Sequence, residues 1–428
     1  MRAHIISIGN ELLIGDTVNT NATWLGRALS EKFISVDYVH TIKDDYTSIF
    51  ETLSFALKQA DVVLMTGGLG PTNDDITKKV VADYYETKLV VDQATLDHIK
   101  DMFKKLNITF SKSNYGQAEV PEACEVLFNS SGTAPGMWFW DEHGILAVMP
   151  GVPSEMKHLM NRHILPRLMD IEEVNGNSVT QYIKTAGVGE STLSDVVLNG
   201  IDTLLNEHVK LASLPNNGGV TFRITAQSSE TASADHYATQ VTEFIKEKAN
   251  DYIYAWNREG SLAEAVGRLL TDKKWTIATA ESCTGGLLSG ALTDVPGSSQ
   301  YTLGGIVSYA NDLKINQLGV QPGTLNEHGA VSKQVALQMA EGVRQKTGAD
   351  VGVSTTGIAG PGGGTDQKPV GTIWMGFAFP EQHFATKVQL TKNRQRNRER
   401  TVKIVLETVR RRLKGIDELP YGLECVEA

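Results

Sequence analysis

The stretch WTIATAESCTGGLLSGALT, from Trp275 to Thr293, carries the pattern that decides the fold class. Its first six residues are a short, largely apolar run typical of a buried strand, and LLSGALT has helical spacing. A sharp turn from strand to helix is where an α/β fold exposes a hydroxyl, but the same place also suits an ordinary helix cap. Three interpretations of AESCTGG therefore stay open: Ser282 is a nucleophile, Cys283 is one, or the run is only a turn.

The same alternation of strands and helices marks the beginning of the chain. HIISIG (His4 to Gly9) and DVVLMTGG (Asp61 to Gly68) are apolar runs that end in glycine, as expected of parallel strands covered on both faces. The segment between them has helical spacing, with Asn21 as the expected N-cap. A further strand, GILAVM (Gly144 to Met149), precedes a helix that Pro153 can open. The pattern predicts an α/β fold built from βαβ units.

The middle of the chain has a different pattern of polar and apolar residues. The polar run IEEVNGNS indicates a linker. Two strand-like runs, VKLASLP and GVTFRITAQ, and an amphipathic helix from about Thr231 to Lys248 predict a small α+β unit. Because this unit carries no cluster of His, Cys or acidic residues, we expect it to be a connector. The predicted domains are residues 1–170, 171–255 and 256–428.

The composition is that of a folded protein without membrane spans. The 428 residues are 41% hydrophobic and 21% charged, and no apolar run approaches the roughly 18 residues that a span needs. The chain turns polar by Gly9, too early for a secretory signal, so we expect a cytoplasmic protein. Three widely separated cysteines give neither a CxxC metal pair nor a disulfide framework. The net charge of −10 argues against nucleic-acid binding by the whole surface.

One stretch departs from this acidic average. Between Lys387 and Lys414, eleven Lys or Arg residues stand against only two Glu residues, Glu399 and Glu407. Two interpretations stay open: the stretch is a solvated face of a terminal helix, or it is an anion site for a phosphorylated ligand.

A glycine-rich strand end in the N-terminal part is the first candidate site. MTGGLGPTNDD (Met65 to Asp75) ends a predicted buried strand with three glycines, where exposed amides can hold phosphate oxygens. Its two carboxylates can coordinate Mg²⁺ or a similar hard cation that bridges a diphosphate. The ordinary alternative is a glycine-rich turn with aspartate caps. The candidate residues of this nucleotide site are Glu11, Asn19, Asn21, Gly67, Gly68, Gly70, Asp74 and Asp75, with Asp74 and Asp75 as metal ligands.

The second candidate site surrounds Ser282. This serine lacks the GxSxG context of an α/β-hydrolase elbow, so another base must activate it. GGIVSYANDLK (Gly304 to Lys314) offers Tyr309 and Lys314, and a lysine desolvated in a pocket can deprotonate a serine. Taken singly, a tyrosine in a strand is usually a core residue and a lysine usually faces solvent.

Backbone amides complete this second candidate site. Gly285 and Gly286 follow the serine and can present their amides to an oxyanion. STTGIAGPGGGT (Ser354 to Thr365) supplies another backbone-rich loop. We rank Cys283 below Ser282 as the nucleophile because no histidine lies close to it in the sequence.

Several motifs resemble the CinA family, the competence/damage-inducible proteins, over nearly the whole chain. GGLGPTNDD, GTAPG and MPGVPSEM resemble the family's N-terminal domain, which has the molybdopterin-binding fold, a three-layer α/β domain. AESCTGG, GGIVSYANDLK, GAVS and TGIAGPGGGTDQKPVGTI resemble its C-terminal α/β amidase domain. The resemblance implies that the central unit is a KH-like connector, although it has no GxxG clamp for RNA.

For the C-terminal domain, the resemblance implies deamidation of nicotinamide mononucleotide to nicotinic acid mononucleotide and ammonia, without a cofactor. Ser282 would attack the carboxamide carbon, with Lys314 and Tyr309 handling its proton and the leaving amine. The register of the arginines is not unique, because KNRQRNRER offers four of them. The implied substrate-binding residues are Thr284, Gly285, Gly286, Thr356, Gly360, Arg394 and Arg398.

For the N-terminal domain, the resemblance implies hydrolysis of ADP-ribose to AMP and ribose 5-phosphate with a divalent metal. The sequence departs from the family pattern at Gly116, where a lysine is common, and at Asn19, where an aspartate is frequent. Losing a cation beside a diphosphate would weaken transition-state stabilisation.

A binding protein is the alternative from another functional class. In this interpretation the chain is an adaptor, linked to competence or DNA repair, that holds a molybdopterin-like or nucleotide ligand without turnover. The basic stretch between Lys387 and Lys414 is its main support. For either function the family suggests a homodimer.

Overall fold

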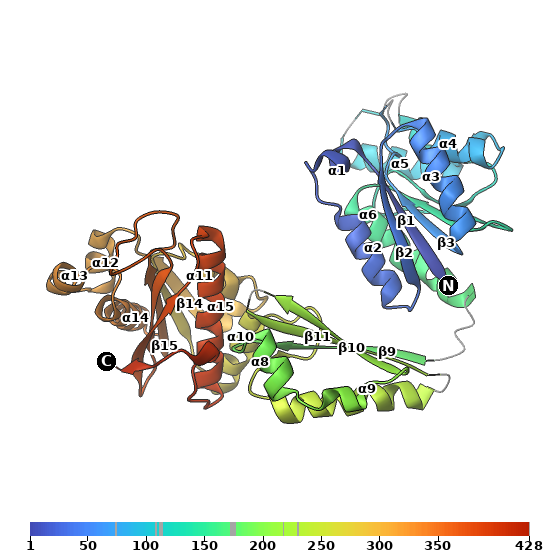
Figure 1. Cartoon of the computed structure of the whole chain (residues 1–428). Coiled ribbons are helices and arrows are strands. Elements are labelled where there is room, and N and C mark those ends of the chain that lie inside the picture. Colours follow the sequence, from blue (N-terminus) through green and yellow to red (C-terminus); the bar gives the residue numbers. More distant parts are fainter. Residues whose placement is uncertain are drawn as a thin grey trace. The chain divides into compact units, whose positions relative to one another are not determined.

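The structure is a computed structural model that describes residues 1–72, 75–107, 109–110, 114–171, 177–216, 218–228 and 231–427 (Figure 1). The chain forms two compact units, Met1–Asn175 and Gly176–Ala428. Helices cover both faces of the large sheet in each unit, which confirms the predicted α/β class. The predicted linker IEEVNGNS falls largely on residues 172–176, outside the described residues.

The first unit is built on a six-stranded sheet with the order β2-β1-β3-β8-β7-β6. The first four of these strands run parallel, and β7 and β6 complete the sheet in antiparallel fashion. The strands are β1 (Arg2–Ile8), β2 (Ser35–Ile42), β3 (Val62–Thr66), β6 (Glu125–Leu127), β7 (Gly136–Asp141) and β8 (Gly144–Met149), and a separate pair joins β4 (Leu89–Val91) to β5 (Glu119–Pro121).

Helices on both faces of this sheet make the unit a three-layer sandwich. Leu25 of α2 and Met156 of α6 pack on one face against Ile5 and Leu64, while Leu53 of α3 packs on the other. β3 is buried along its whole length because both of its faces are covered. The helices of the unit are α1 (Asn10–Ile14), α2 (Thr20–Ser30), α3 (Tyr46–Gln59), α4 (Thr77–Tyr84), α5 (Gln93–Lys105), α6 (Pro153–Leu159) and α7 (Leu165–Ile171).

The start of α2 differs from the sequence-based expectation. The N-cap is Asn19, whose Oδ1 accepts a hydrogen bond from the amide of Ala22 at 2.9 Å. Asn21 already lies in the first turn and points elsewhere: its Nδ2 donates to the carbonyl of Gly151 at 2.7 Å. The prediction of Asn21 as the cap was wrong because the helix begins two residues earlier than its apolar pattern indicates.

The second unit begins with an antiparallel sheet in the order β10-β11-β9-β12. Alternate residues of β11, among them Phe222 and Ile224, pack under α9. This arrangement confirms the predicted small α+β unit. Its main elements are β9 (Asn177–Thr185), α8 (Glu190–Thr192), β10 (Val209–Asn216), β11 (Gly219–Ser228), α9 (Thr231–Ala249) and β12 (Ile253–Ala255).

The rest of the second unit is a six-stranded sheet in the order β14-β13-β15-β16-β17-β18, with β14, β13 and β15 parallel. Helices α10, α11 and α15 pack on one face, and α12, α13 and α14 pack on the other. The strands are β13 (Ile277–Glu281), β14 (Thr302–Val307), β15 (Val351–Gly357), β16 (Thr372–Ala378), β17 (His383–Gln389) and β18 (Val426–Glu427). The helices are α10 (Leu262–Lys273), α11 (Leu287–Thr293), α12 (Asn311–Leu318), α13 (Pro322–His328), α14 (Lys333–Thr347) and α15 (Arg394–Leu413).

The stretch from Trp275 to Thr293 forms the predicted strand, turn and helix as β13, a five-residue turn and α11. β13 is fully buried and lies between β14 and β15. The carboxyl ends of these parallel strands meet at one edge of the sheet, where ligand sites of α/β folds form. Across the described residues, no helix is long and apolar enough to traverse a membrane.

Candidate functional site

Ser282 lies in the turn between β13 and α11, half-buried. Its amide donates to the carbonyl of Thr355 at 2.9 Å, which fixes the start of the turn against β15. Gly285 and Gly286 have φ angles of +58° and +95°, left-handed values that a residue with a side chain adopts at a cost. The turn therefore needs glycine at these two positions to bring the chain from strand to helix.

Lys314 reaches Ser282 from the first turns of α12. Its Nζ lies 3.2 Å from Oγ of Ser282, and its side chain is only 1% exposed. Nζ also donates to two carbonyls, those of Ser308 at 2.8 Å and Tyr309 at 3.1 Å. Burial lowers the pKa of Lys314 below its ordinary value of 10.5. When the amine is neutral, its two N–H groups can serve the two carbonyls, which leaves the lone pair for the Ser282 hydroxyl.

The Tyr309 side chain does not take the position that sequence reasoning gave it. Its hydroxyl accepts a hydrogen bond from Nη2 of Arg394 at 3.0 Å, and the residue is 59% exposed. Its backbone carbonyl, rather than its phenol, contacts Lys314. Within the described part of the chain, Tyr309 thus orients the lysine through its backbone and meets an arginine through its side chain.

Arg394 and Arg398 lie one helical turn apart on the same face of α15 and reach the two glycine-rich loops. Nη1 of Arg394 donates to the carbonyl of Gly360 at 3.1 Å, and Nη2 of Arg398 donates to the carbonyl of Thr284 at 2.7 Å. The other two arginines of the stretch lie elsewhere: Arg400 lies over the ring of Tyr421, and Arg396 lines a surface pocket beside Pro215 and Asn216. The guanidinium groups of Arg394 and Arg398 each keep further N–H donors for an anion.

Two threonines expected to bind substrate are used inside the protein instead. Thr284 is fully buried, and its hydroxyl pairs with that of Thr355 at 2.7 Å. Thr356 is 1% exposed and donates to the carbonyl of Ala330 at 2.7 Å. Both side chains hold loops together, so the expectation that Thr284 and Thr356 bind substrate is corrected as far as their side chains are concerned.

Cys283 points into the apolar core under α10 and α15 rather than into the site. It is 4% exposed, and burial raises the pKa of its thiol to about 12. A thiol with so high a pKa is not a thiolate near neutral pH and is a poor nucleophile. The geometry therefore favours Ser282 over Cys283.

Glu281 is the residue of this site that sequence reasoning missed. Its carboxylate is fully buried and accepts hydrogen bonds from the amides of Gly286 at 2.9 Å, Leu288 at 3.0 Å and Ser289 at 2.8 Å. The amide of Gly286 is consequently not available for an oxyanion, contrary to expectation. One sequence signal could have identified Glu281: it is a glutamate at the end of an apolar strand, directly before a glycine-rich turn.

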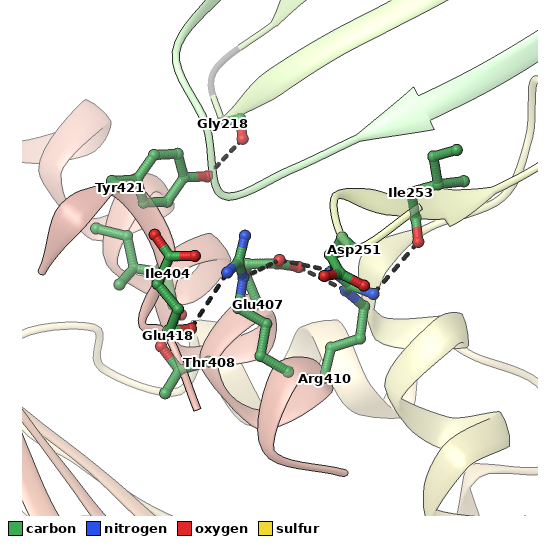
Figure 2. Close-up of polar contacts among 10 residues, drawn as sticks. Gly218, Asp251, Ile253, Ile404, Glu407, Thr408, Arg410, Glu418 and Tyr421 are labelled. Atoms are coloured by element: carbon green, nitrogen blue, oxygen red, sulfur yellow. Dashed lines mark hydrogen bonds and ion pairs between the residues drawn. The ribbon is translucent and has the colours of Figure 1, made fainter. Parts of the chain in front are cut away.

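The arginines of α15 make contacts at separate places and do not form a single basic patch. Glu407 is fully buried between Arg410 and Arg411, which are each 1% exposed and donate to its carboxylate at 2.7 and 2.9 Å. Figure 2 shows Glu407 and Arg410 beside the backbone of Asp251 and Ile253, whose carbonyls accept from Arg410. This buried network ties β12 to α15, while Arg394 and Arg398 near the start of the helix reach the two glycine-rich loops.

In the first unit, a cavity of about 130 Å³ lies at the carboxyl ends of β1 and β3. Its lining includes Ser7, Glu11, Asn19, Asn21 and Thr66. The predicted residues Glu11, Asn19 and Asn21 thus come together.

The glycines after β3 are held in a tight turn. Gly67 and Gly68 have φ angles of +112° and +65°. A Cβ added at Gly68 would lie 2.1 Å from Oγ1 of Thr77, and one at Gly70 would lie 2.5 Å from Oδ2 of Asp75. The turn therefore depends on the small size of these residues.

The predicted metal ligands were Asp74 and Asp75. Asp74 lies outside the described residues, and Oδ2 of Asp75 accepts from the amide of Thr72 at 3.0 Å and from its hydroxyl. No group of three or more His, Cys, Asp or Glu side chains that could hold a metal ion occurs in the described ranges. The described donors do not by themselves fit a divalent cation, and we derive no step through one.

The side chain of a lysine from another segment lies beside Gly116, the position where a lysine is common in the family. Nζ of Lys78, from α4, donates to the carbonyls of Gly116 at 3.1 Å and Gln117 at 2.7 Å. Burial lowers the pKa of Lys78 to about 8. Sequence reasoning missed this lysine because it lies 38 residues before the position that it contacts.

Three family models match successive parts of the chain: "Probable molybdopterin binding domain" over residues 4–170, "Damage-inducible protein CinA KH domain" over 180–255 and "CinA C-terminal domain" over 259–413. A competence-damage inducible protein of Acetivibrio thermocellus is 39% identical over 97% of this chain and all of its own length. A CinA-like protein of Salinibacter ruber is 41% identical over 96% of this chain and all of its own length.

Among solved structures, that of a competence/damage inducible protein from Agrobacterium tumefaciens is 41% identical, covering 36% of this chain and 93% of its own, with a TM-score of 0.35. Because two relatives with about 40% identity match almost the whole sequence, the chain belongs to the CinA family of competence/damage-inducible proteins.

Proposed function

We propose that the C-terminal part of the chain hydrolyses the carboxamide of nicotinamide mononucleotide, giving nicotinic acid mononucleotide and ammonia. The observation that carries this proposal is the 3.2 Å separation between Nζ of the buried Lys314 and Oγ of Ser282. A lysine whose pKa is lowered by burial can be neutral, and only a neutral amine can take the serine proton. No cofactor is required for this chemistry.

The reaction divides into two balanced steps. Oγ of Ser282 attacks the carboxamide carbon while its proton passes to Nζ of Lys314, and the carbonyl electrons move onto oxygen. When the tetrahedral intermediate collapses, the C–N bond breaks and the lysine ammonium gives its proton to the departing amine, which leaves as ammonia. Water, deprotonated by the same lysine, then attacks the ester, and the serine recovers its proton as the acid is released.

The oxyanion of this intermediate needs hydrogen-bond donors. The amides of Thr284 and Gly285 follow Ser282 closely and have no backbone hydrogen-bond partner among the described residues. The Thr284 carbonyl is held by Arg398, so the planar peptide directs the Gly285 amide away from that arginine. Donors of this kind contribute about 10²-fold or more to kcat.

The paired arginines support a phosphorylated substrate. Arg394 and Arg398 bring two positive charges to the two loops that flank Ser282. Guanidinium groups suit phosphate because their N–H donors match its oxygens in geometry. A nucleotide bearing a carboxamide at one end and a 5′-phosphate at the other satisfies both halves of the site.

An ammonia-release assay on the full-length protein tests the proposal. Wild type should release ammonia from nicotinamide mononucleotide, Ser282→Ala should release none, and Cys283→Ala should retain most of the activity. Full activity in Ser282→Ala would exclude this serine, and a folded but inactive Cys283→Ala would favour the cysteine. Tight, salt-sensitive binding of nucleic acid without any turnover would favour the adaptor alternative.

For the N-terminal unit we propose a second activity, the hydrolysis of ADP-ribose to AMP and ribose 5-phosphate, in which a divalent metal would need ligands beyond the described donors, such as Asp74. The cavity beside Glu11 and Asn21, together with the glycine turn after β3, supports a nucleotide ligand. AMP formation with and without added Mg²⁺ tests both the activity and its metal requirement. Absence of AMP under both conditions would reject it without affecting the amidase proposal.

A further inference from the structure

We propose that Glu281 is a positioning residue for the acyl-transfer step, which fixes Ser282 and its following amides through buried hydrogen bonds. The inference rests on the proposed amidase function. Glu281 is the last residue of β13 and the direct neighbour of Ser282, and its side chain is fully buried. A charge in that position has to be stabilised within the protein.

Apart from the Thr279 hydroxyl on β13 itself, which donates at 3.4 Å, the partners of the Glu281 carboxylate belong to the far side of the turn. One carboxylate oxygen accepts from the amides of Gly286 at 2.9 Å and Leu288 at 3.0 Å. The other accepts from the amide of Ser289 at 2.8 Å and from its hydroxyl at 2.7 Å. The carboxylate thus spans the turn and joins its first residue to the start of α11.

No cation shares this task in the part of the chain that the structure describes. Glu281 forms no ion pair with Lys, Arg or His there, so amide and hydroxyl donors alone balance its charge. α11 has no side-chain cap of its own, because its N-cap residue is Gly286. The Glu281 side chain, which comes from the strand, is the missing acceptor, and the amides at the start of α11 donate to it.

This arrangement separates the amides of the turn into two groups. Those of Gly286, Leu288 and Ser289 are bound by Glu281. Those directly after Ser282 keep their hydrogen-bonding capacity for the reacting carbonyl. Because the two groups share one short turn, loosening the Glu281 end shifts the donors at the Ser282 end, and misplacing donors by about 1 Å can cost about 10²-fold in rate.

Steady-state kinetics of Glu281→Gln on nicotinamide mononucleotide test the inference. The glutamine keeps the volume but presents an NH₂ group to amides that also donate, so at least one partner is lost. We expect kcat to fall about 10²-fold while KM changes less than about threefold, at a temperature where circular dichroism shows the variant fully folded. A purely structural role would instead leave the kcat of the folded fraction unchanged.

Two further variants keep the test decisive. Ser289→Ala removes one hydroxyl partner of Glu281 and should lower kcat about threefold to tenfold. This variant provides the test of the positioning role if Glu281→Gln does not fold. Glu264→Gln is the matched control, because Glu264 also caps a helix of this unit. It forms a capping box with Ser261, whose two hydrogen bonds lie at the start of α10 and do not involve Glu281 or Ser282, so the variant should keep wild-type kcat.

The outcomes separate the two proposals. Wild-type kcat in folded Glu281→Gln and in Ser289→Ala overturns the positioning role while the amidase stands. A wild-type protein that releases no ammonia overturns the amidase, and the positioning role falls with it.

Discussion

Replacing Glu407 by glutamine should strongly destabilise the second unit. Glu407 is fully buried and accepts three hydrogen bonds from guanidinium groups: two from Arg410, both at 2.7 Å, and one from Arg411 at 2.9 Å. Both arginines are buried, so the variant would leave two positive charges without a counter-charge. We therefore expect the hydrogen bonds and ion pairs of this network to be lost together.

The magnitude follows from these contacts. At an effective dielectric constant of about 20, two unit charges about 4 Å apart interact by about 4 kcal/mol, and Glu407 has two such partners. The neutral glutamine retains one oxygen acceptor but turns a donor toward a guanidinium. Removing one partner of a buried ion pair costs about 3–5 kcal/mol, which is a large share of the roughly 5–15 kcal/mol that stabilises a domain.

Pulse hydrogen exchange across a urea series on the full-length protein measures this loss. Peptides from α15 and β12 should show a midpoint lowered by about 2 M, taking an m-value of about 2 kcal/mol/M. β12 is included because Arg410 donates to the carbonyl of Ile253. Peptides from β1 belong to the first unit and should be unchanged.

The matched control is Glu243→Gln on α9. Glu243 pairs with Lys246 three residues later, as Glu407 does with Arg410, but these side chains are 59% and 50% exposed. An exposed pair contributes less than about 1 kcal/mol, so its midpoint should barely move. The reasoning would be refuted if Glu407→Gln shifted the α15 midpoint by no more than this control.

Three further predictions concern the two candidate sites. Burial lowers the pKa of Lys314 below 10.5, so kcat for ammonia release should rise with pH as the amine loses its proton and should level off before pH 10.5. Lys314→Arg stays protonated and should be inactive at every pH of the same pH–rate profile. Arg394→Gln should raise KM for nicotinamide mononucleotide about tenfold or more and leave hydrolysis of nicotinamide riboside, which lacks the phosphate, nearly unchanged. Gly68→Ala should destabilise the first unit by about 1–3 kcal/mol in urea unfolding, because its φ is +65° and Thr77 blocks the new Cβ, whereas Gly26→Ala inside α2 should be neutral or stabilising.

Much of the fold could be predicted because its signals are local. Buried strands such as β3 and β13 appear as continuous apolar runs, and glycines mark where they end. The N-cap of α2 was misplaced because Asn19 and Asn21 are both suitable cap residues. Only the position of the first helical turn distinguishes them.

The serine and lysine of the second site could also be proposed from local context, whereas the roles of their neighbours could not. Thr284 and Thr356 follow the motif as ligand residues would, yet their hydroxyls pair with Thr355 and with the Ala330 carbonyl. A hydroxyl can face a ligand or a backbone with the same sequence around it. The choice depends on residues from other strands, which no local pattern reveals.

By itself the sequence determined the strands β1, β3, β8 and β13, and it placed Ser282 in a turn between a buried strand and a helix. It could do so because hydrophobic period and glycine conformation act over a few residues. The tertiary structure alone decided which charges and donors meet: Lys314 with the serine, two of four arginines with the glycine loops, Glu281 with the amides of α11, and Glu407 with two buried guanidinium groups. Coulombic and hydrogen-bond energies depend on separations of a few ångströms and on exclusion of water. Those quantities are set only when distant segments pack together.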